Sequence, residues 1–457
     1  MNDAAAEFDV IVIGAGPAGE VVAGELAGRG RSVAIVEERL VGGECAFFAC
    51  MPSKALLRPA EVLAEAHRVP GAAEALSGEL DVAAVLRRRD EVTGGLDDAR
   101  ELPWLAERAI TLIRGRGRLA GERTVAVDGL PHRARHAVVI ATGSAPSLPD
   151  VPGLAQALPW TNREATTAEA VPASLVVLGG GVVGVEMAQA YRELGADVAI
   201  VEPLERLLSR EEEFASEEVA AALRALGVEL RLGAHASAVA REGAGVRVEL
   251  DDGSRLEAEE ILVAAGRRPL SDDLGLETVG LRGGETIEVD DRLRAGGHEW
   301  LYAVGDVNGH SLQTHVGKYQ ARVAADVIAG GDARVLHDRA GAPRVVFSDP
   351  QVAAVGLTLA EALARGLDAR AYDSPTSATA GASFHGRGTA GTSRLVLDAD
   401  RRILAGATFV GVEVAEWLHA ATIAVVAEVP LELLRHATPA FPTRSEVWLR
   451  LLERIEL

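Results

Sequence analysis

The sequence predicts an α/β fold with two Rossmann-like dinucleotide-binding domains and a C-terminal α+β domain. Three observations support this fold class. A strand–turn–helix–strand pattern begins at Phe8 and occurs again from Ser174. Segments rich in Pro and Gly, at 141–159 and near 264–270, indicate crossings between domains. From about Val345 onward, short strand-like runs mix with helical patterns, and no glycine-rich turn of the same type occurs.

The first repeated unit has the glycine spacing of a dinucleotide-binding turn. Gly14 is placed to make the tight turn, Gly16 to let the backbone approach a pyrophosphate, and Gly19 to let helix and strand pack closely. The pyrophosphate then lies at the helix N-terminus, where N–H groups and the helix dipole favour an anion. Glu37, at the end of the second strand, is suited to accept hydrogen bonds from ribose hydroxyls.

The second unit repeats these positions with the same spacing. They are Gly179, Gly181, Gly184 and Glu202. A single GxGxxG match is weak evidence, but two matches that each follow a strand, open a helix and precede an acidic residue predict two dinucleotide sites. Glu202 suits a free ribose 2′-hydroxyl and repels a 2′-phosphate, so we predict NADH in the second site. The nearby Arg206 leaves NADPH open.

Composition and charge exclude several classes of function. The 457 residues allow two to four domains, and 48% hydrophobic residues allow a large core. The net charge of −21 argues against nucleic acid and anionic membranes as partners. The longest apolar stretch, about 420–427, is far shorter than the roughly 20 residues of a membrane span. Because the N-terminus also lacks a signal-peptide pattern, we expect a cytoplasmic protein.

The two cysteines lie close together in the segment GGECAFFACMPSKALL. Two are too few for a disulfide scaffold or a thiolate zinc site, and we predict no metal site. In a reducing compartment, a pair such as Cys45 and Cys50 is more often catalytic than structural. If the segment begins a helix, its N-terminus and Lys54, one turn later, favour a thiolate. Two buried thiols or an inert disulfide are the alternatives.

Together, these motifs resemble those of the pyridine nucleotide-disulfide oxidoreductases over nearly the whole chain, and within that family most of all the lipoamide dehydrogenases. The matching segments are GAGPAG, GGxCxxxxCxPSK, ATGS, GGGVVGVE, GRRP, GDV and a closing PTxSE-like segment. The resemblance implies an FAD domain over 1–147, an NAD domain over 148–268 and a return segment to the FAD domain over 269–340. It also implies a dimerisation domain over 341–457, and therefore a homodimer.

The same resemblance implies roles for individual residues. Cys45 would be the interchange thiol that meets the substrate, and Cys50 the charge-transfer thiolate that faces the flavin. Lys54 would lie near flavin N5, paired with Glu186, although an ordinary surface ion pair is the alternative. Asp306 would hold the ribityl chain. Further cofactor contacts are implied at Gly43, Gly117, Thr142, Gly143, Ser144, Gly266 and His315.

The closing segment departs from the family pattern. Disulfide reductases of this family usually end in HPTxSE, whose His, from the partner subunit, acts as acid and base and is oriented by the Glu. Here the segment is FPTRSE, and the Phe441 side chain cannot move a proton. Glu446 either keeps the orienting position or forms a capping box with Thr443, and we favour the capping box. His436 could replace the imidazole only after a register shift.

The redox loop, which is the stretch between Cys45 and Cys50, also departs from the family pattern. The family commonly has Asn and Gly between the cysteines, where this chain has Ala-Phe-Phe-Ala. Phe47, Phe48 and Phe441 either make the thiol side apolar or are ordinary core aromatics. Mercuric reductases also lack the His but use a C-terminal cysteine pair that this chain does not contain, so we do not predict that activity.

We therefore predict an enzyme that passes electrons from NADH through FAD to the Cys45–Cys50 disulfide and on to a small disulfide substrate. A quinone or another non-disulfide oxidant is the alternative acceptor, because the acid–base His is missing. A flavoprotein module that only binds or regulates belongs to a different class of function. The retained cysteines, Lys54 and Glu186 argue against such a module.

Overall fold

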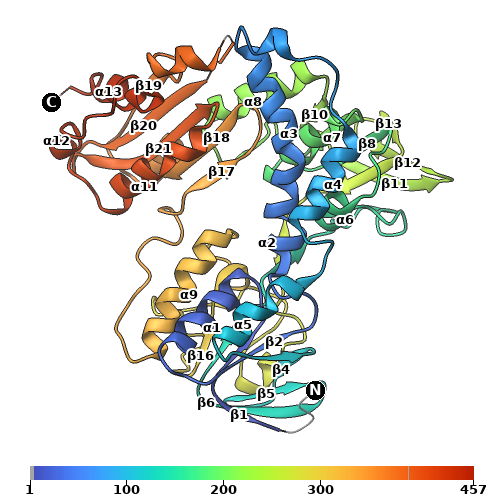
Figure 1. The fold of residues 1–457 in the computed structure, drawn as a ribbon, viewed down its shortest axis with the longest axis vertical. Coiled ribbons are helices and arrows are strands. Elements are labelled where there is room, and N and C mark those ends of the chain that lie inside the picture. The colour runs from blue at the N-terminus through green and yellow to red at the C-terminus, as the bar shows by residue number, and fades with distance from the viewer. Residues whose placement is uncertain (1–4, 387, 390, 457) are drawn as a thin grey trace. The chain divides into compact units, whose positions relative to one another are not determined.

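The computed structural model describes residues 5–386, 388–389 and 391–456, which form an α/β fold (Figure 1). Backbone contacts divide the chain into two units. The first comprises the residues up to Pro52, Arg89–Ser147 and Arg267–Arg339, and the second comprises Ser53–Arg88, Leu148–Gly266 and the residues from Ala340. The second unit joins the residues of the predicted NAD and dimerisation domains and also contains residues 53–88, so this division into two units does not test the four predicted segments.

The first unit contains a largely parallel sheet with the strand order β3-β2-β1-β6-β5-β4, in which β5 and β4 are antiparallel. Strand β16 pairs with β6 in parallel, outside this order. The strands are β1 (Glu7–Ile13), β2 (Val33–Glu37), β3 (Thr111–Arg114), β4 (Gly117–Leu119), β5 (Thr124–Val127), β6 (Leu130–Ile140) and β16 (Leu301–Ala303). A short pair, β7 (Ser144–Pro146) and β15 (Arg267–Pro269), marks the crossings. The central strands are continuous apolar runs because both faces of the sheet are covered.

Helices of the first unit are α1 (Pro17–Gly28), α2 (Gly43–Phe47), α5 (Leu102–Glu107) and α9 (Thr314–Ile328), with the 3-10 turns η2 (Asp98–Arg100), η3 (Leu276–Val279) and η4 (Gly305–Asn308). Helices α1 and α9 lie side by side (Figure 1). Small residues allow this approach, since a Cβ added at Gly317 would lie 3.3 Å from the Cα of Gly305 and 3.4 Å from the Cβ of Ala18. The packing holds the start of α9 beside the turn that follows β16.

The second unit contains three sheets. A parallel sheet has the order β10-β9-β8-β14, a hairpin sheet the order β11-β12-β13, and a five-stranded antiparallel sheet the order β17-β18-β21-β20-β19. The strands are β8 (Ser174–Leu178), β9 (Asp197–Glu202), β10 (Glu229–Leu232), β11 (Ala236–Glu242), β12 (Gly245–Leu250), β13 (Arg255–Ala258), β14 (Glu260–Val263), β17 (Arg344–Val346), β18 (Gln351–Gly356), β19 (Ala369–Pro375), β20 (Thr392–Asp398) and β21 (Ile403–Gly411).

The helices of this unit surround these sheets, and α3 and α4 each have residues in both units. They are α3 (Cys50–Arg68), α4 (Val82–Val92), α6 (Asn162–Thr167), α7 (Val182–Glu193), α8 (Glu213–Leu226), α10 (Leu359–Ala364), α11 (Leu418–Val426), α12 (Leu431–Leu434) and α13 (Val447–Leu452), with the 3-10 turns η1 (Ala73–Ala75), η5 (Gly381–His385), η6 (Val414–Trp417) and η7 (Arg444–Glu446). The predicted α+β domain at the C-terminus is confirmed by the five-stranded sheet and its helices.

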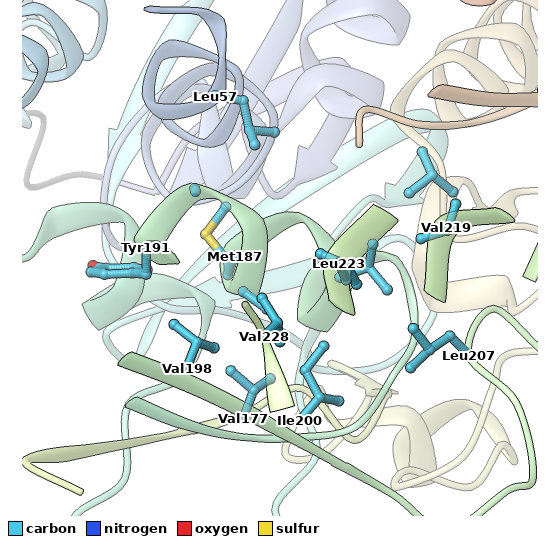
Figure 2. Packing of buried hydrophobic residues seen from close by; sticks show 14 of the residues in the cluster. Leu57, Val177, Met187, Tyr191, Val198, Ile200, Leu207, Val219, Leu223 and Val228 are labelled. Carbon is cyan, nitrogen blue, oxygen red and sulfur yellow. The ribbon is translucent and has the colours of Figure 1, made fainter. Parts of the chain in front are cut away.

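One of the apolar clusters of the second unit includes residues from α3, the parallel sheet and the antiparallel sheet. Figure 2 shows side chains of the parallel sheet, such as Val177 and Ile200, gathered with Met187 of α7 and Leu223 of α8. Leu57 of α3 belongs to the same cluster, as do buried valines of β17, β18 and β21. The core therefore fixes α3, α7 and the antiparallel sheet to one another. In the described part of the chain, no helix combines the length and the apolar character that a membrane span requires.

Candidate active site

The first glycine-rich turn has the geometry that a bound pyrophosphate requires. Gly14 has a φ of +102°, and a Cβ there would lie 2.5 Å from the carbonyl oxygen of Ala141. A Cβ at Gly19 would lie 1.9 Å from the carbonyl oxygen of Gly14, so only glycine allows α1 to pack on this turn. At Gly16, the N-cap of α1, the corresponding space is open to 4 Å. This opening at a helix N-terminus fits the pyrophosphate of FAD.

The second turn repeats these contacts. Gly179 has a φ of +114°, and its Cβ would lie 2.5 Å from the carbonyl oxygen of Ala264. A Cβ at Gly184 would lie 1.9 Å from the Gly179 carbonyl oxygen, while the space at Gly181, the N-cap of α7, is open to 4 Å. The internal repeat is therefore a repeat of structure, and the second turn fits the pyrophosphate of a pyridine nucleotide in the same way.

The acidic residues that end β2 and β9 are held by backbone N–H groups. Glu37 accepts hydrogen bonds from the N–H groups of Ala15 (2.8 Å) and Arg39 (2.7 Å). Glu202 accepts the corresponding pair at 2.5 and 2.8 Å. The guanidinium of Arg206 donates to two carbonyl oxygens of its own turn, at 2.9 and 2.7 Å. The Arg206 guanidinium, the group that could have favoured NADPH by binding its 2′-phosphate, is therefore already hydrogen-bonded within the protein.

A small polar network surrounds the predicted ribityl contact. The Ser144 hydroxyl donates to a carboxylate oxygen of Asp306 at 2.5 Å, and Nε of Arg267 donates to the same hydroxyl at 2.7 Å. Burial raises the pKa of Asp306. These side chains would hold the polar chain of FAD.

The remaining glycines and Thr142 shape the backbone around this network. The Thr142 hydroxyl donates to the carbonyl oxygen of Leu270 at 2.7 Å, and the carbonyl of Gly143 accepts the Leu270 N–H at 3.0 Å. Gly266 has a φ of +108°, which favours glycine. Gly117 lies in β4, where a Cβ would come within 3.0 Å of a valine side chain of β2, so its evident role is packing.

The cysteines lie on two consecutive helices. Cys45 is in α2, and Cys50 is the first residue of α3. Both are thiols rather than a disulfide, and the pKa of Cys45 is raised by its hydrogen bond with Cys50 and by burial. The resemblance to the family implies that Cys50 is the thiolate of the pair. A Cβ at Gly43 would lie 2.8 Å from the Cα of Gly16, so α2 packs directly against the first glycine-rich turn.

Sequence reasoning missed a third group beside the sulfurs. Thr314, the first residue of α9, places its hydroxyl oxygen 3.5 Å from the sulfur of Cys50. The predicted flavin neighbour His315 follows it and is exposed. The only signal in the sequence was that Thr314 precedes His315, the predicted flavin neighbour. That signal could not show whether the hydroxyl lies near Cys45 or near Cys50.

Half-buried Lys54 forms an ion pair with buried Glu186. Their side chains approach to 2.6 Å, and Glu186 is only 3% exposed, so the interpretation as an ordinary surface pair is wrong. The N–H of Phe347 donates to the other Glu186 oxygen at 3.0 Å, and the Lys54 ammonium lies 4.7 Å from the centre of the Phe347 ring. Phe347 belongs to a region without a motif, so sequence reasoning missed it.

The two phenylalanines of the redox loop are in different surroundings. Phe47 is 4% exposed, and a Cβ at Gly42 would lie 3.0 Å from its ring. Phe48 is half-buried, and the two ring centres are 6.3 Å apart. Phe47 is therefore a core side chain, whereas Phe48 contributes apolar surface to the loop.

The closing segment does not form the favoured capping box. The Thr443 hydroxyl donates to the carbonyl oxygen of Ala440 at 2.6 Å and makes no cap contact, so that prediction is wrong. Glu446 is 7% exposed, and within the described residues its Oε2 has no hydrogen-bond partner. Phe441 is 77% exposed, and His436 is exposed as well. A buried carboxylate thus stands near the end of the chain without the imidazole that usually accompanies it.

Comparison with known proteins identifies the family of the chain. Residues 8–325 match the family described as pyridine nucleotide-disulphide oxidoreductase, and residues 342–451 match its dimerisation domain. The dihydrolipoyl dehydrogenase of Mycobacterium tuberculosis is 36% identical over 96% of both chains. A mercuric reductase of Lysinibacillus sphaericus is 31% identical over 96% of this chain and 81% of its own length.

Solved structures of other proteins have the same fold. The Cu(II) complex of the HOCl-induced flavoprotein disulfide reductase RclA from Escherichia coli superposes with a TM-score of 0.87 at 26% identity, over 98% of this chain and 100% of that one. LpdA from Mycobacterium tuberculosis gives a TM-score of 0.84, also at 26% identity and with the same coverage. The chain therefore belongs to the pyridine nucleotide-disulphide oxidoreductase family and is an FAD-dependent oxidoreductase that uses a pyridine nucleotide.

Proposed function

We propose that this enzyme oxidises NADH and delivers the electrons to a quinone or a similar oxidant, and that small disulfides are slower acceptors. The observation that carries the proposal is Phe441, an exposed side chain without a titratable group at the family's acid–base position. FAD, when bound, supplies hydride acceptance and passes electron pairs to a disulfide or to an external oxidant. The residues of the protein determine which acceptor is reduced faster.

Proton delivery is the step that separates the two acceptors. Attack on a disulfide requires the Cys45 thiolate, and the hydrogen bond with Cys50 and burial raise the pKa of Cys45. The leaving thiolate must then take a proton from water, because Phe441 has none to give. A quinone reduced without passing through Cys45 avoids both requirements. We also propose that the enzyme works in the cytoplasm. In that reducing compartment a close pair of cysteines is more often catalytic than structural.

A small disulfide remains the second candidate acceptor. It is favoured by the presence of both thiols and by the ion pair between Lys54 and the buried Glu186, which the resemblance to the family implies. NADH consumption should be compared across lipoamide, glutathione disulfide, quinones and metal ions. Faster turnover with quinones supports the proposal, and faster turnover with lipoamide supports the second candidate. A yellow protein that oxidises NADH with none of these acceptors would contradict both.

The enzyme should prefer NADH to NADPH by about 5- to 150-fold in kcat/KM, because Glu202 repels a 2′-phosphate. Glu202→Gln should narrow the preference, since it removes the charge. Arg206→Ala is the matched control, because its guanidinium is bound to carbonyl oxygens of its own turn. Steady-state kinetics with both nucleotides and a common quinone measure the ratio. Equal kcat/KM values in the wild type would refute the assignment.

We expect a homodimer that is formed through the C-terminal sheet and its helices. Large apolar side chains are exposed there, namely Phe384, Ile423, Leu433, Phe441 and Leu449. Light scattering at micromolar concentration should give twice the mass of 47.7 kDa. Leu433→Glu should weaken the dimer, whereas the control Leu158→Glu should not, although Leu158 is the more exposed (76% against 61%). A monomeric wild type would contradict this expectation.

A further inference from the structure

We propose that Gln189 and Glu193 of α7 act together as positioning residues for Glu186. They hold segment 347–349 against the helix, and that segment in turn holds the carboxylate that pairs with Lys54. The inference deepens the proposed function, because it rests on Lys54 lying beside the flavin that NADH reduces. It names side chains that no motif of the sequence indicated.

One face of α7 carries three polar side chains. Glu186, Gln189 and Glu193 are spaced by three and then four residues, so they lie on the same side of the helix. Met187 and Tyr191 of the same helix belong instead to the apolar cluster (Figure 2). Glu186 and Gln189 are only 3% and 4% exposed. Because a buried polar group without a partner is costly, the hydrogen bonds of these side chains determine where their partners lie.

The backbone that follows β17 is bound to this face at two points. The Phe347 N–H donates to Oε1 of Glu186 at 3.0 Å, and the Asp349 N–H donates to Oε1 of Gln189 at 2.8 Å. The other oxygen of Glu186 lies 2.6 Å from the Lys54 ammonium. The Gln189 bond therefore restricts where the Phe347 N–H can lie, and that N–H holds the carboxylate of the ion pair.

Glu193 sets the orientation of the Gln189 amide. Nε2 of Gln189 donates to Oε1 of Glu193 at 3.0 Å. Because this carboxyl oxygen accepts the amide NH₂, the amide oxygen is left to face the Asp349 N–H. A flipped amide would set two donors against each other, and the bond to the segment would be lost. Glu193 thus acts on Glu186 through Gln189.

The Glu193 carboxyl lies among groups of like charge. Its pKa is raised to about 7 by burial and by the carboxylates of Asp349 and Glu61. Those two carboxylates have their own cations, since Arg68 pairs with Asp349 and Arg58 lies 2.7 Å from Glu61. Oε2 of Glu193 is buried and has no hydrogen-bond partner among the described residues. An added negative charge at this position would therefore be poorly compensated.

Ionisation of Glu193 should loosen the segment. An acid whose pKa is raised by folding holds its proton more tightly in the folded protein than in the unfolded chain. Its stabilising contribution is therefore present at low pH and is lost as the pH rises from 4.5 through about 7. Above that range, the Glu193 carboxylate repels that of Asp349, whose N–H binds Gln189. The hold on Glu186 is expected to weaken across neutral pH.

Hydrogen exchange measures the hold on the segment directly. In the holoenzyme at pH 6, the amide hydrogens of Phe347 and Asp349 should exchange about 3- to 10-fold faster in Gln189→Leu than in the wild type. Mass spectrometry with fragmentation resolves the two amides. Glu193→Gln keeps an accepting oxygen and should exchange at the wild-type rate. Glu217→Gln, the same substitution at an exposed glutamate of α8, is the matched control.

The pH dependence tests the part played by Glu193. At pH 8, the Phe347 amide should exchange about 3- to 10-fold faster in the wild type than in Glu193→Gln. In anaerobic stopped-flow experiments, the rate at which NADH reduces the flavin should fall with a midpoint near pH 7 in the wild type. Glu193→Gln should lack this step, and Glu217→Gln should keep it.

An unchanged exchange rate at Phe347 in Gln189→Leu would overturn the inference, as would a pH step that persists in Glu193→Gln. If Gln189→Leu does not fold, the pH step in Glu193→Gln decides. Exchange that responds without any change in flavin reduction would also overturn it, because the network would then not serve the flavin. If the expected pH step is present but quinones are reduced slowly, the proposed function fails and the inference stands.

Discussion

Phe441→His should raise kcat/KM for lipoamide by at least about 10-fold, toward the 10²–10⁴-fold that a positioned acid–base group contributes. The wild-type enzyme should be a poor lipoamide reductase. The gain is expected because Glu446 is buried and its Oε2 lacks a partner within the described chain, and the resemblance to the family implies that this carboxylate orients a histidine at position 441. Quinone reduction should change little.

The measurement compares kcat/KM for lipoamide and for a quinone in the wild type, Phe441→His and the control Phe441→Leu. Because the reactive form of Cys45 is the thiolate and its pKa is raised, lipoamide turnover by the wild type should increase with pH. Lipoamide turnover by the Phe441→His variant should depend less steeply on pH. Wild-type turnover above ~10⁵ M⁻¹s⁻¹, well within the ordinary enzyme range, would show that another group supplies the proton. His436 would then be the first residue to replace.

Cys50→Ser should abolish the long-wavelength absorbance that appears when NADH is added without oxygen. The reason is that the resemblance to the family assigns the charge-transfer thiolate to Cys50, whose hydrogen bond with Cys45 raises the pKa of Cys45. In Cys45→Ser the absorbance should persist, since Cys50 and Thr314 remain in place. An anaerobic titration followed by absorbance distinguishes the two variants, and an unchanged band in Cys50→Ser would end the assignment of the thiolate to Cys50.

The same variants separate the two acceptors. Either cysteine substitution should lower lipoamide turnover by more than about 10³-fold, because disulfide exchange needs both sulfurs. A quinone reduced without the dithiol should retain most of its rate. If quinone turnover falls as far as lipoamide turnover, both acceptors depend on the cysteine pair and the proposed route to quinones is wrong.

The nucleotide-binding turns could be predicted from the sequence with their individual glycine roles. Gly14, Gly16 and Gly19 act within one strand–turn–helix unit, and the steric demands at each position are local. The structure shows the same two close distances at Gly179 and Gly184 and the same open space at Gly181. Local spacing also predicted the ends of β2 and β9, where each carboxylate binds N–H groups of its own unit.

The closing segment shows where a local motif misleads. Thr443 and Glu446 have the spacing of a capping box, but the threonine hydroxyl donates to an earlier carbonyl instead. A hydroxyl group has one proton to donate, and the fold of the preceding loop decides which acceptor it meets. The burial of Glu446 likewise comes from the packing of the antiparallel sheet and its helices.

The sequence by itself determined the fold class, the two dinucleotide turns and the presence of a cysteine pair with Lys54 one turn away. Only the tertiary structure decided what surrounds that pair. Thr314 reaches Cys50 across 264 positions of chain, and Glu186 meets Lys54 across 132. The physical reason is that backbone geometry acts over a few residues, whereas burial and hydrogen bonding between side chains depend on which distant elements the core brings together.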